Sequence, residues 1–287
     1  MTLISIIICL FTERFLNELS TARNYAWYKI YSAQLIKTTK FLSSKTVVLL
    51  IVLPVPLIVA FVDYKFIQNP ILQFLFATTL LLLSMGPKPF YEITKDFCNT
   101  YKKEETDVAQ WLASKLLNRD LTTEEQENLA FTFVRSLFII ANDRILGPIF
   151  WFIILGPMGA LFFRLSSELR YLCKRNEAFI AIKPAANLLH AILNWIPARL
   201  TAFGYAAMGN FVTAINHCKK DENIIQNLSL KNNQRILYSA GIGALEKTGD
   251  KSSFSHADVI QTLSLIRRSY ALLLGILALL TLAGWII

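Results

Sequence analysis

Residues 145–163 read ILGPIFWFIILGPMGALFF and contain no charged side chain. Three further uncharged runs lie at 46–62, 66–87 and 269–287. A helix of about 20 mostly apolar residues crosses the hydrocarbon core of a bilayer. The sequence therefore predicts an all-α, polytopic helical membrane protein, with about four spans plus a broken or re-entrant helix and a cytoplasmic helical region. It excludes an ordinary soluble enzyme, a disordered chain and a secreted disulfide scaffold.

The overall composition agrees with this prediction. Of the 287 residues, 54% are hydrophobic and 17% are charged, against roughly 25% charged in an average soluble domain. The formal net charge of +9 indicates basic cytoplasmic loops rather than a nucleic-acid partner. The four cysteines contain no CxxC pair, which predicts reduced thiols and no cysteine-based zinc site.

Region 1–86 is expected to form the N-terminal transmembrane helices. The apolar segment at its start has no basic residue before it and no small-residue cleavage site, so it is interpreted as a retained first helix. Five basic residues and no acid lie between Leu19 and Asp63, which places loop 20–45 in the cytoplasm. Run 46–62 then crosses outward with a kink at Pro54 and Pro56, and run 70–86 returns.

Region 87–144 is expected to be a cytoplasmic helical region, since it contains 8 basic and 10 acidic residues. One helix in it is well marked. Thr122 and Glu125 have the spacing of a capping box. The apolar side chains that follow fall on one helical face: Leu129, Phe133, Leu137 and Ile140.

Region 145–218 is interpreted as broken or re-entrant membrane helices that hold a polar site. Gly156 and Pro157 interrupt its first run, and five basic residues follow between 164 and 183. If 145–163 crossed fully, those residues would lie outside, against the positive-inside tendency. Region 219–268 is a cytoplasmic segment in which Ser255 caps a helix, and 269–287 is the C-terminal transmembrane helix.

Arg199 is the sharpest candidate for a binding residue, because it is the only formal charge in residues 184–218. It follows Pro197, which starts or breaks a helix, and a guanidinium at a helix start suits a phosphate or carboxylate. The expected anion site also contains Asn194, Arg164 and Arg144. The alternative interpretation is an internal ion pair or snorkelling to the interface.

Three further charges are expected as buried ion-pair partners: Glu13, Arg14 and Asp143. The competing interpretation is that Glu13 and Arg14 only mark a helix end among the headgroups. No catalytic residue, metal site or cofactor is predicted. The histidines lack metal-ligand spacing, and residues 243–252 lack the spacing of a phosphate-binding P-loop.

Three blocks of this sequence resemble the AmpE family. They are Met1-Thr-Leu with Glu13-Arg14, Gly147-Pro148 with Gly156-Pro-Met-Gly-Ala160, and Leu193-Asn-Trp195-Ile-Pro197-Ala-Arg199-Leu. The resemblance implies a multi-pass protein of the bacterial inner (cytoplasmic) membrane, linked to the induction of chromosomal β-lactamase. The same blocks are more distantly similar to the CobD/CbiB membrane proteins of cobalamin synthesis, a resemblance that implies ATP-dependent joining of an aminopropanol phosphate to cobyric acid.

The departures from the CobD/CbiB pattern affect its acidic residues. Where those proteins have a Glu-Asn pair before the aspartate matching Asp143, this chain has Ile139 and Ile140. Where they have an Asn and an Asp after the matching arginine, it has Ser167 and Arg170. Because neither isoleucine can bind a metal or transfer a proton, the resemblance favours a protein that is not a ligase.

Two function classes follow from these patterns. The first is a regulatory membrane protein that binds a muropeptide or another anionic ligand and modulates β-lactamase induction, with a functional link to a cytoplasmic anhydromuramyl amidase. The second is a membrane-embedded CobD/CbiB-like amide ligase or transferase with altered acidic residues. A solute channel is a weaker third class. In each case the lipid bilayer is a partner.

Overall fold

The structure is a computed structural model that describes residues 2–15, 25–39, 41–85, 90–117, 120–220, 232–247 and 253–284. Helix is the only regular secondary structure across these ranges. The chain is an all-α, multi-pass membrane protein, as the apolar runs predict. It divides into two compact units, one of Met1–Pro87, Asp143–Trp195 and Ala278–Ile287, and one of Lys88–Asn142 and Ile196–Leu277.

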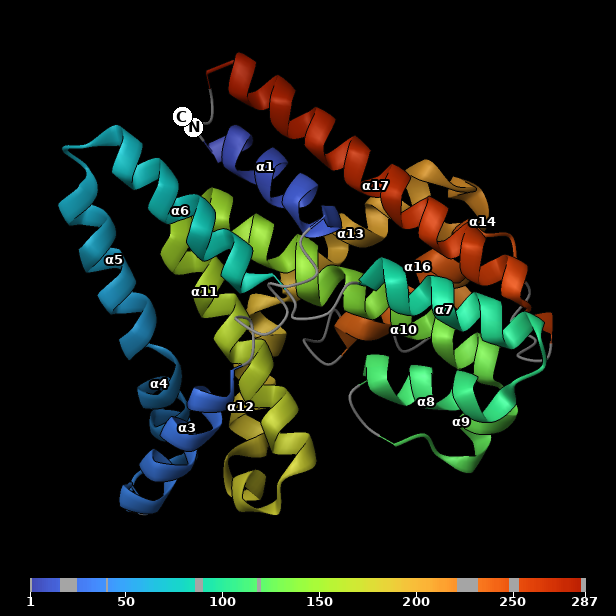
Figure 1. The fold of residues 1–287 in the computed structure, drawn as a ribbon, viewed down its shortest axis with the longest axis horizontal. Helices are drawn as coiled ribbons and strands as arrows, with labels where there is room; N and C mark the ends of the chain where they lie inside the picture. Colours follow the sequence, from blue (N-terminus) through green and yellow to red (C-terminus); the bar gives the residue numbers. More distant parts are fainter. Residues whose placement is uncertain are drawn as a thin grey trace. The chain divides into compact units, whose positions relative to one another are not determined.

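The first unit is built around one long helix, α11. Its elements are α1 (Thr2–Phe15), α3 (Ala26–Thr38), α4 (Ser44–Val52), α5 (Pro54–Phe66), α6 (Pro70–Ser84), α11 (Gly147–Arg175), the 3₁₀ segment η2 (Glu177–Ile182) and α12 (Lys183–Leu193). Helix α11 packs against α5, α6 and α12, and α1 packs on α6. Figure 1 shows α5 and α6 as neighbouring helices joined by a short turn.

Hydrogen bonds join α1 to α6. The Thr78 hydroxyl donates to the Ser5 hydroxyl at 3.0 Å, and the Cys9 thiol donates to the Thr78 carbonyl at 3.3 Å. Small polar side chains of this kind hold apolar helices together where water does not reach. The first helix expected from the sequence is therefore present and packed.

The prolines of run 46–62 interrupt the helix where the sequence predicts. Helix α4 ends at Val52 and α5 begins at Pro54. A proline lacks the amide proton that an interior helical position donates, but it fits the first turn of a new helix. The two helices together form a candidate span over Ser44–Phe66.

The predicted break at Gly156 is also present. Gly156 has φ 65° and ψ −154° inside α11. This conformation is disfavoured for residues with a Cβ atom, and Pro157 follows it at once. The helix nevertheless resumes after the break and continues to Arg175, which is longer than the sequence indicates. Whether 145–163 re-enters or crosses stays a prediction.

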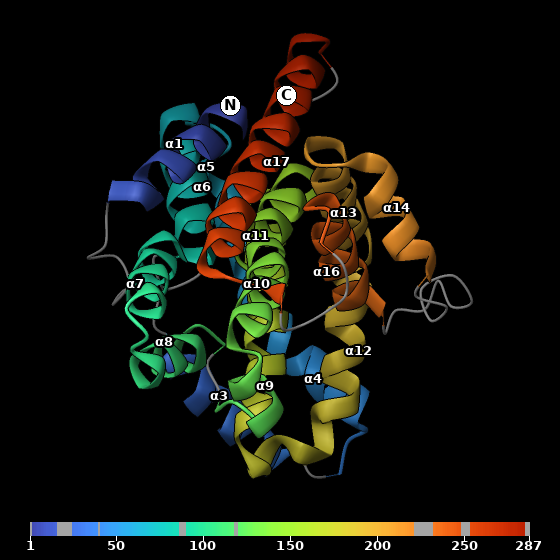
Figure 2. The same cartoon turned by 90° about the vertical axis from the view of Figure 1, so that its right-hand side faces the viewer.

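The second unit has its own apolar core. Its elements are α7 (Phe90–Lys102), α8 (Thr106–Leu117), α9 (Thr123–Glu127), α10 (Leu129–Ala141), α13 (Trp195–Met208), α14 (Phe211–Lys220), α16 (Asn233–Ala244) and α17 (His256–Leu282). Trp195 and the last five residues of α17 belong to the first unit. Helices α7 and α8 pack as a pair, as do α14 and α16 (Figure 2).

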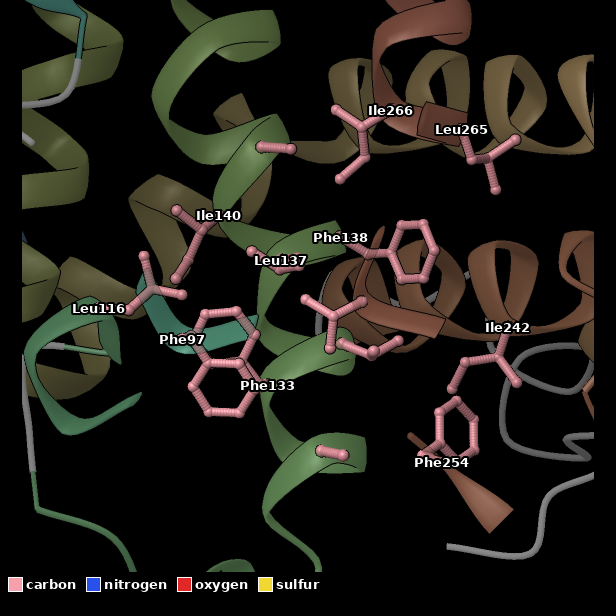
Figure 3. Packing of buried hydrophobic residues seen from close by; sticks show 14 of the residues in the cluster. Phe97, Leu116, Phe133, Leu137, Phe138, Ile140, Ile242, Phe254, Leu265 and Ile266 are labelled. Atoms are coloured by element: carbon pink, nitrogen blue, oxygen red, sulfur yellow. The ribbon is translucent and has the colours of Figure 1, made fainter. Parts of the chain in front are cut away.

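Helix α10 supplies the centre of this core (Figure 3). The rings of Phe97 and Phe133 stack with centroids 3.7 Å apart. Phe138 lies against Gly241, where a Cβ atom would come within 2.6 Å of its ring. Leu129, Phe133, Leu137 and Ile140 are all buried, so the predicted apolar face is confirmed.

The capping box of Thr122 and Glu125 is confirmed with one difference of extent. The Thr122 amide donates to the Glu125 carboxylate at 3.1 Å, and the Glu125 amide donates to the Thr122 hydroxyl at 3.4 Å. The helix stops after Glu127 and restarts at Leu129. Ser255 precedes α17, but its hydroxyl and amide both donate to the Asp258 carboxylate, so the bonds run to the acid and differ from those of the predicted serine cap. The sequence predicts one helix that begins at Ser255 and another over 269–287. In the structure they form one continuous helix, α17.

Three helical runs in the described part of the chain are long and apolar enough to cross a membrane: Ser44–Phe66, Leu129–Arg175 and His256–Leu282. A fourth candidate joins Glu177–Leu193 and Trp195–Met208, which are separated by a break at Asn194. The apolar parts of α1 and α6 are shorter, so their crossing stays a prediction. Many large apolar side chains on α5 are exposed, including Leu57, Ile58 and Phe61, as expected of a surface that faces lipid.

Candidate functional site

Asp143 is the centre of a buried polar cluster in the first unit. It lies in η1, the π-helical turn Asn142–Leu146 that connects α10 to α11, and its side chain has no exposed surface. A π-turn widens the helix by one residue and is frequent at functional sites. Its carboxylate accepts hydrogen bonds from Arg170 at 2.9 Å and from the Asn194 side-chain amide at 3.1 Å.

Arg170 supplies the opposite charge for Asp143. It lies on α11 and is 9% exposed. A carboxylate removed from water loses its hydration, and a buried pair becomes tolerable when hydrogen bonds replace that hydration. The Asn194 amide and the Arg170 guanidinium both serve this purpose. Asp143 and Arg170 therefore form a buried ion pair.

His190 is a further member of the cluster. It is buried on α12, and its Nε2 atom lies 3.8 Å from an Asp143 carboxylate oxygen. Its Nδ1 atom is 3.3 Å from the Ser166 hydroxyl, and its ring packs against Phe163 with centroids 5.3 Å apart. The sequence gives this histidine no special role, yet the fold brings it to the only acid of the η1 turn.

Arg164 is a second buried arginine of α11, six residues before Arg170. It forms an ion pair with Glu168 on the same helix, and its guanidinium lies 5.4 Å from the centroid of the Tyr25 ring. Tyr25 in turn donates to the Leu83 carbonyl at 2.8 Å. The predicted role of Arg164 in binding an anion therefore has to compete with an internal carboxylate.

Arg144 is half-buried beside Asp143. Among the described residues, no group of three or more His, Cys, Asp or Glu side chains is arranged to hold a metal ion.

Arg199 belongs to the second unit. It lies on α13, is half-buried, and donates to the side-chain oxygen of Asn233 at 3.2 Å. Two residues further on, the Thr201 hydroxyl donates to the side chain of Asn142 at 2.9 Å. Because Asp143 lies in the first unit, a shared site of Arg199 and Asp143 stays a prediction. The side chains of Glu13 and Arg14 fall outside the described part of the chain, so their predicted pairing stays a prediction too.

The structure thus brings Asn194 and Asp143 together, and it adds two residues that the sequence patterns did not indicate, Arg170 and His190. Arg170 follows Asp143 by 27 residues and His190 follows it by 47, so no local spacing connects them. Glu168 could have been found, because it stands four residues after Arg164, the separation at which helical side chains meet.

The CobD/CbiB protein family matches residues 13–245. This chain belongs to that family. It is 25% identical over 142 residues to the cobalamin biosynthesis protein CobD of Chromobacterium violaceum, which is 49% of this chain and 46% of that protein. It is 28% identical over 131 residues to the CobD of Stutzerimonas stutzeri, covering 45% and 43%. A probable CobD of Methanothermobacter thermautotrophicus is 35% identical over 103 residues, covering 34% of each.

These alignments span at most about half the length of the relatives compared. No solved structure gives a significant match. Membership of the CobD/CbiB family confirms the more distant of the two expected resemblances. None of the relatives named above is an AmpE protein, so AmpE-type regulation stays a proposal.

Proposed function

We propose that this chain is a membrane-embedded amide ligase or transferase of the CobD/CbiB type that works with an altered set of acidic residues. The observation that carries the proposal is the family match over residues 13–245, together with relatives that are named cobalamin biosynthesis proteins. The family resemblance implies two anionic substrates, a carboxylic acid and an amino alcohol phosphate.

The charges of the first unit support anionic substrates. Between 143 and 170 the chain carries three guanidiniums, Arg144, Arg164 and Arg170, and two carboxylates, Asp143 and Glu168. Arginine presents a planar fork that matches a phosphate or carboxylate. Asn194, on the far side of Asp143, adds an amide that bonds the same carboxylate. In this proposal the anion site consists of Arg144, Arg164, Asn194 and Arg199.

The arrangement of the acidic residues favours a second function. Asp143 is fully buried and bonded to Arg170 and Asn194, and Ile139 and Ile140 replace the family's Glu-Asn pair. In this alternative the chain is an AmpE-like regulator of the bacterial inner membrane. A muropeptide or similar anion would shift the packing of its helices and modulate β-lactamase induction, alongside an anhydromuramyl amidase.

One experiment separates the two functions. The detergent-solubilised chain is incubated with Mg²⁺, ATP, cobyric acid and aminopropanol phosphate, and the products are measured by mass spectrometry. Binding of anhydromuropeptides is measured in parallel by calorimetry. Formation of the amide supports the ligase, and saturable muropeptide binding without turnover supports the regulator. Absence of both would contradict the two proposals together.

Arg199→Ala tests the anion site in either case. We expect the variant to insert into the membrane normally but to lose ligand binding or turnover by at least about tenfold, since a charge-assisted hydrogen bond contributes about 1.5–3 kcal/mol. Arg268→Ala makes the same chemical change at an exposed position of α17 and should behave like the unchanged protein. Equal behaviour of the two variants would remove Arg199 from the site.

A further inference from the structure

One end of the first unit gathers a set of cations on a packed surface. We call it the basic tip, and it consists of α3, the turn and helix start at 41–45, and residues 174–183. Its described residues include six cations and one acid, Glu177. All six cations are exposed: Lys29, Lys37, Lys45, Lys174, Arg175 and Lys183. The formal charge of the basic tip is therefore five units positive.

The parts of the basic tip are held together by direct contacts. Helices α3 and α4 pack on each other, and both pack on η2. The Ser44 hydroxyl donates to the Ala181 carbonyl at 3.1 Å, and the Tyr31 hydroxyl donates to the Leu50 carbonyl at 3.2 Å. Ser43 caps α4 by accepting from the Thr46 amide. Figure 1 shows α3 beside the lower end of α4.

Large apolar side chains stand among these cations. Phe41 is fully exposed, and Trp27, Ile30, Leu42 and Ile180 are each between 46% and 61% exposed. Trp27 also lies against Tyr28, with ring centroids 5.6 Å apart. Aromatic rings at the ends of membrane helices are typical of the headgroup region, where one edge of the ring is apolar and the other is wet.

The position of the basic tip relative to the membrane follows from the candidate span that starts inside it. The candidate span Ser44–Phe66 starts inside it, and Phe41 is three residues away from that start. Three residues reach at most about 11 Å, so Phe41 lies at the membrane surface when Ser44–Phe66 crosses. We propose that the basic tip docks on anionic phospholipid headgroups, with Phe41 and Leu42 inserted among the acyl chains and the lysines bound to the phosphates.

The bilayer is the occupant that this surface fits. Exposure of five large apolar side chains to water is unfavourable, and six cations gain little electrostatic attraction from a neutral bilayer. Juxtamembrane basic clusters attract anionic lipid, and the attraction falls off within a Debye length. This inference concerns lipid and stands whether the chain is a ligase or a regulator.

Lipid selectivity tests the charge half of the proposal. The intact chain is reconstituted in vesicles, and its association with spin-labelled phosphatidylglycerol is compared with that of spin-labelled phosphatidylcholine. We expect a preference for phosphatidylglycerol that Lys37→Glu with Lys45→Glu lowers at least about twofold. Lys102→Glu with Lys103→Glu makes the same change of charge on exposed residues outside the basic tip and should leave the preference intact. An equal loss in both variants would overturn the proposal.

Insertion of Phe41 tests the apolar half. A bimane label is attached to Phe41→Cys in a Cys218→Ser background, in which the remaining three native cysteines are buried. We expect lipid-borne nitroxide to quench the label, and aqueous iodide to quench it far less than it quenches free bimane-cysteine. Iodide quenching equal to that of the free dye would overturn the proposal. Phe41 and both lysines are exposed, so these variants keep the packed core.

Discussion

Asp143 shows how one buried acid organises the first unit. Its carboxylate has no exposed surface and accepts hydrogen bonds from Arg170 and Asn194. Replacing both members of a buried ion pair by apolar groups can leave the stability unchanged. Removing one member leaves the other charge buried without a partner, which lowers the stability. The polar cluster is therefore stable only while its members are all present.

Asp143→Asn should lower the free energy of unfolding by about 3–5 kcal/mol, because Arg170 would remain buried without an opposite charge. The loss is measured by unfolding the purified chain in mixed micelles. Combining it with Arg170→Gln should cost less than the sum of the single losses. Glu105→Gln, at an exposed site in the α7–α8 turn, is the matched control. Strictly additive losses at 143 and 170 would show that the pair is not coupled.

Cys98 gives a prediction of pH dependence. Burial on α7 raises the pKa of its thiol from the ordinary 9.0 to about 11. The unfolded chain therefore releases this proton near pH 9 while the folded chain keeps it, so stability falls as the pH rises from 9 towards 11. Iodoacetamide should label Cys98 slowly at pH 8, and half-exposed Cys218 should react faster. Peptide mass spectrometry measures the extent of labelling at each thiol. Equal rates at the two thiols would contradict the prediction.

Among the elements, the break in α11 is the one whose sequence signal and geometry agree most closely. A glycine followed by proline predicts an interruption, and Gly156 has a positive φ of 65°. Similar agreement holds at Pro54 and at the capping box of Thr122 and Glu125. Each of these signals acts between residues at most four positions apart, which is why sequence alone is enough.

Gly156→Ala should destabilise the chain by about 1–3 kcal/mol, because an alanine in this backbone conformation is strained even though no atom lies near its Cβ position. Gly275→Ala is the matched control, since it lies inside α17 with ordinary helical geometry and open space around its Cβ position. That change should be neutral or stabilising by about 0.4–1 kcal/mol. Thermal unfolding of both variants decides the comparison, and equal stability would show that the break carries no strain.

The polar cluster could be predicted only in part. Asn194 and Asp143 stand out because each is a polar residue next to long apolar runs. Arg170 and His190 do not, because their contact with Asp143 depends on how α11 and α12 pack. The uncharged run indicates the membrane part of α11 but not where the helix ends, because its continuation to Arg175 carries charged residues.

At the scale of the whole molecule, the apolar runs predicted the fold class, and family membership agrees with it. The order of crossings is still an inference from charge. The basic stretch before Asp63 places that side in the cytoplasm, so the turn at 63–70 is expected outside and region 87–144 inside. Two spans, Ser44–Phe66 and the shorter α6, connect these sides in that prediction.

Reporter fusions test this topology. Alkaline phosphatase joined after Asn69 should be active, since it folds only outside the cytoplasm, and the same fusion after Glu104 should be inactive. Green fluorescent protein at the two positions should give the opposite result. Activity of the phosphatase at both positions would show that α6 does not cross, and would move region 87–144 to the external side.

The buried pair also has a consequence for the way the chain is made. Asp143 leaves the ribosome 27 residues before Arg170 and 51 residues before Asn194, which both bond its carboxylate. At about 5–20 residues per second, translation of those 51 residues takes roughly 3–10 s. Arg170 is made about half-way through that interval and Asn194 only at its end, so we expect the acid to stay hydrated in the insertion machinery until the later helices arrive. Release of α11 into lipid is thereby tied to the synthesis of α12.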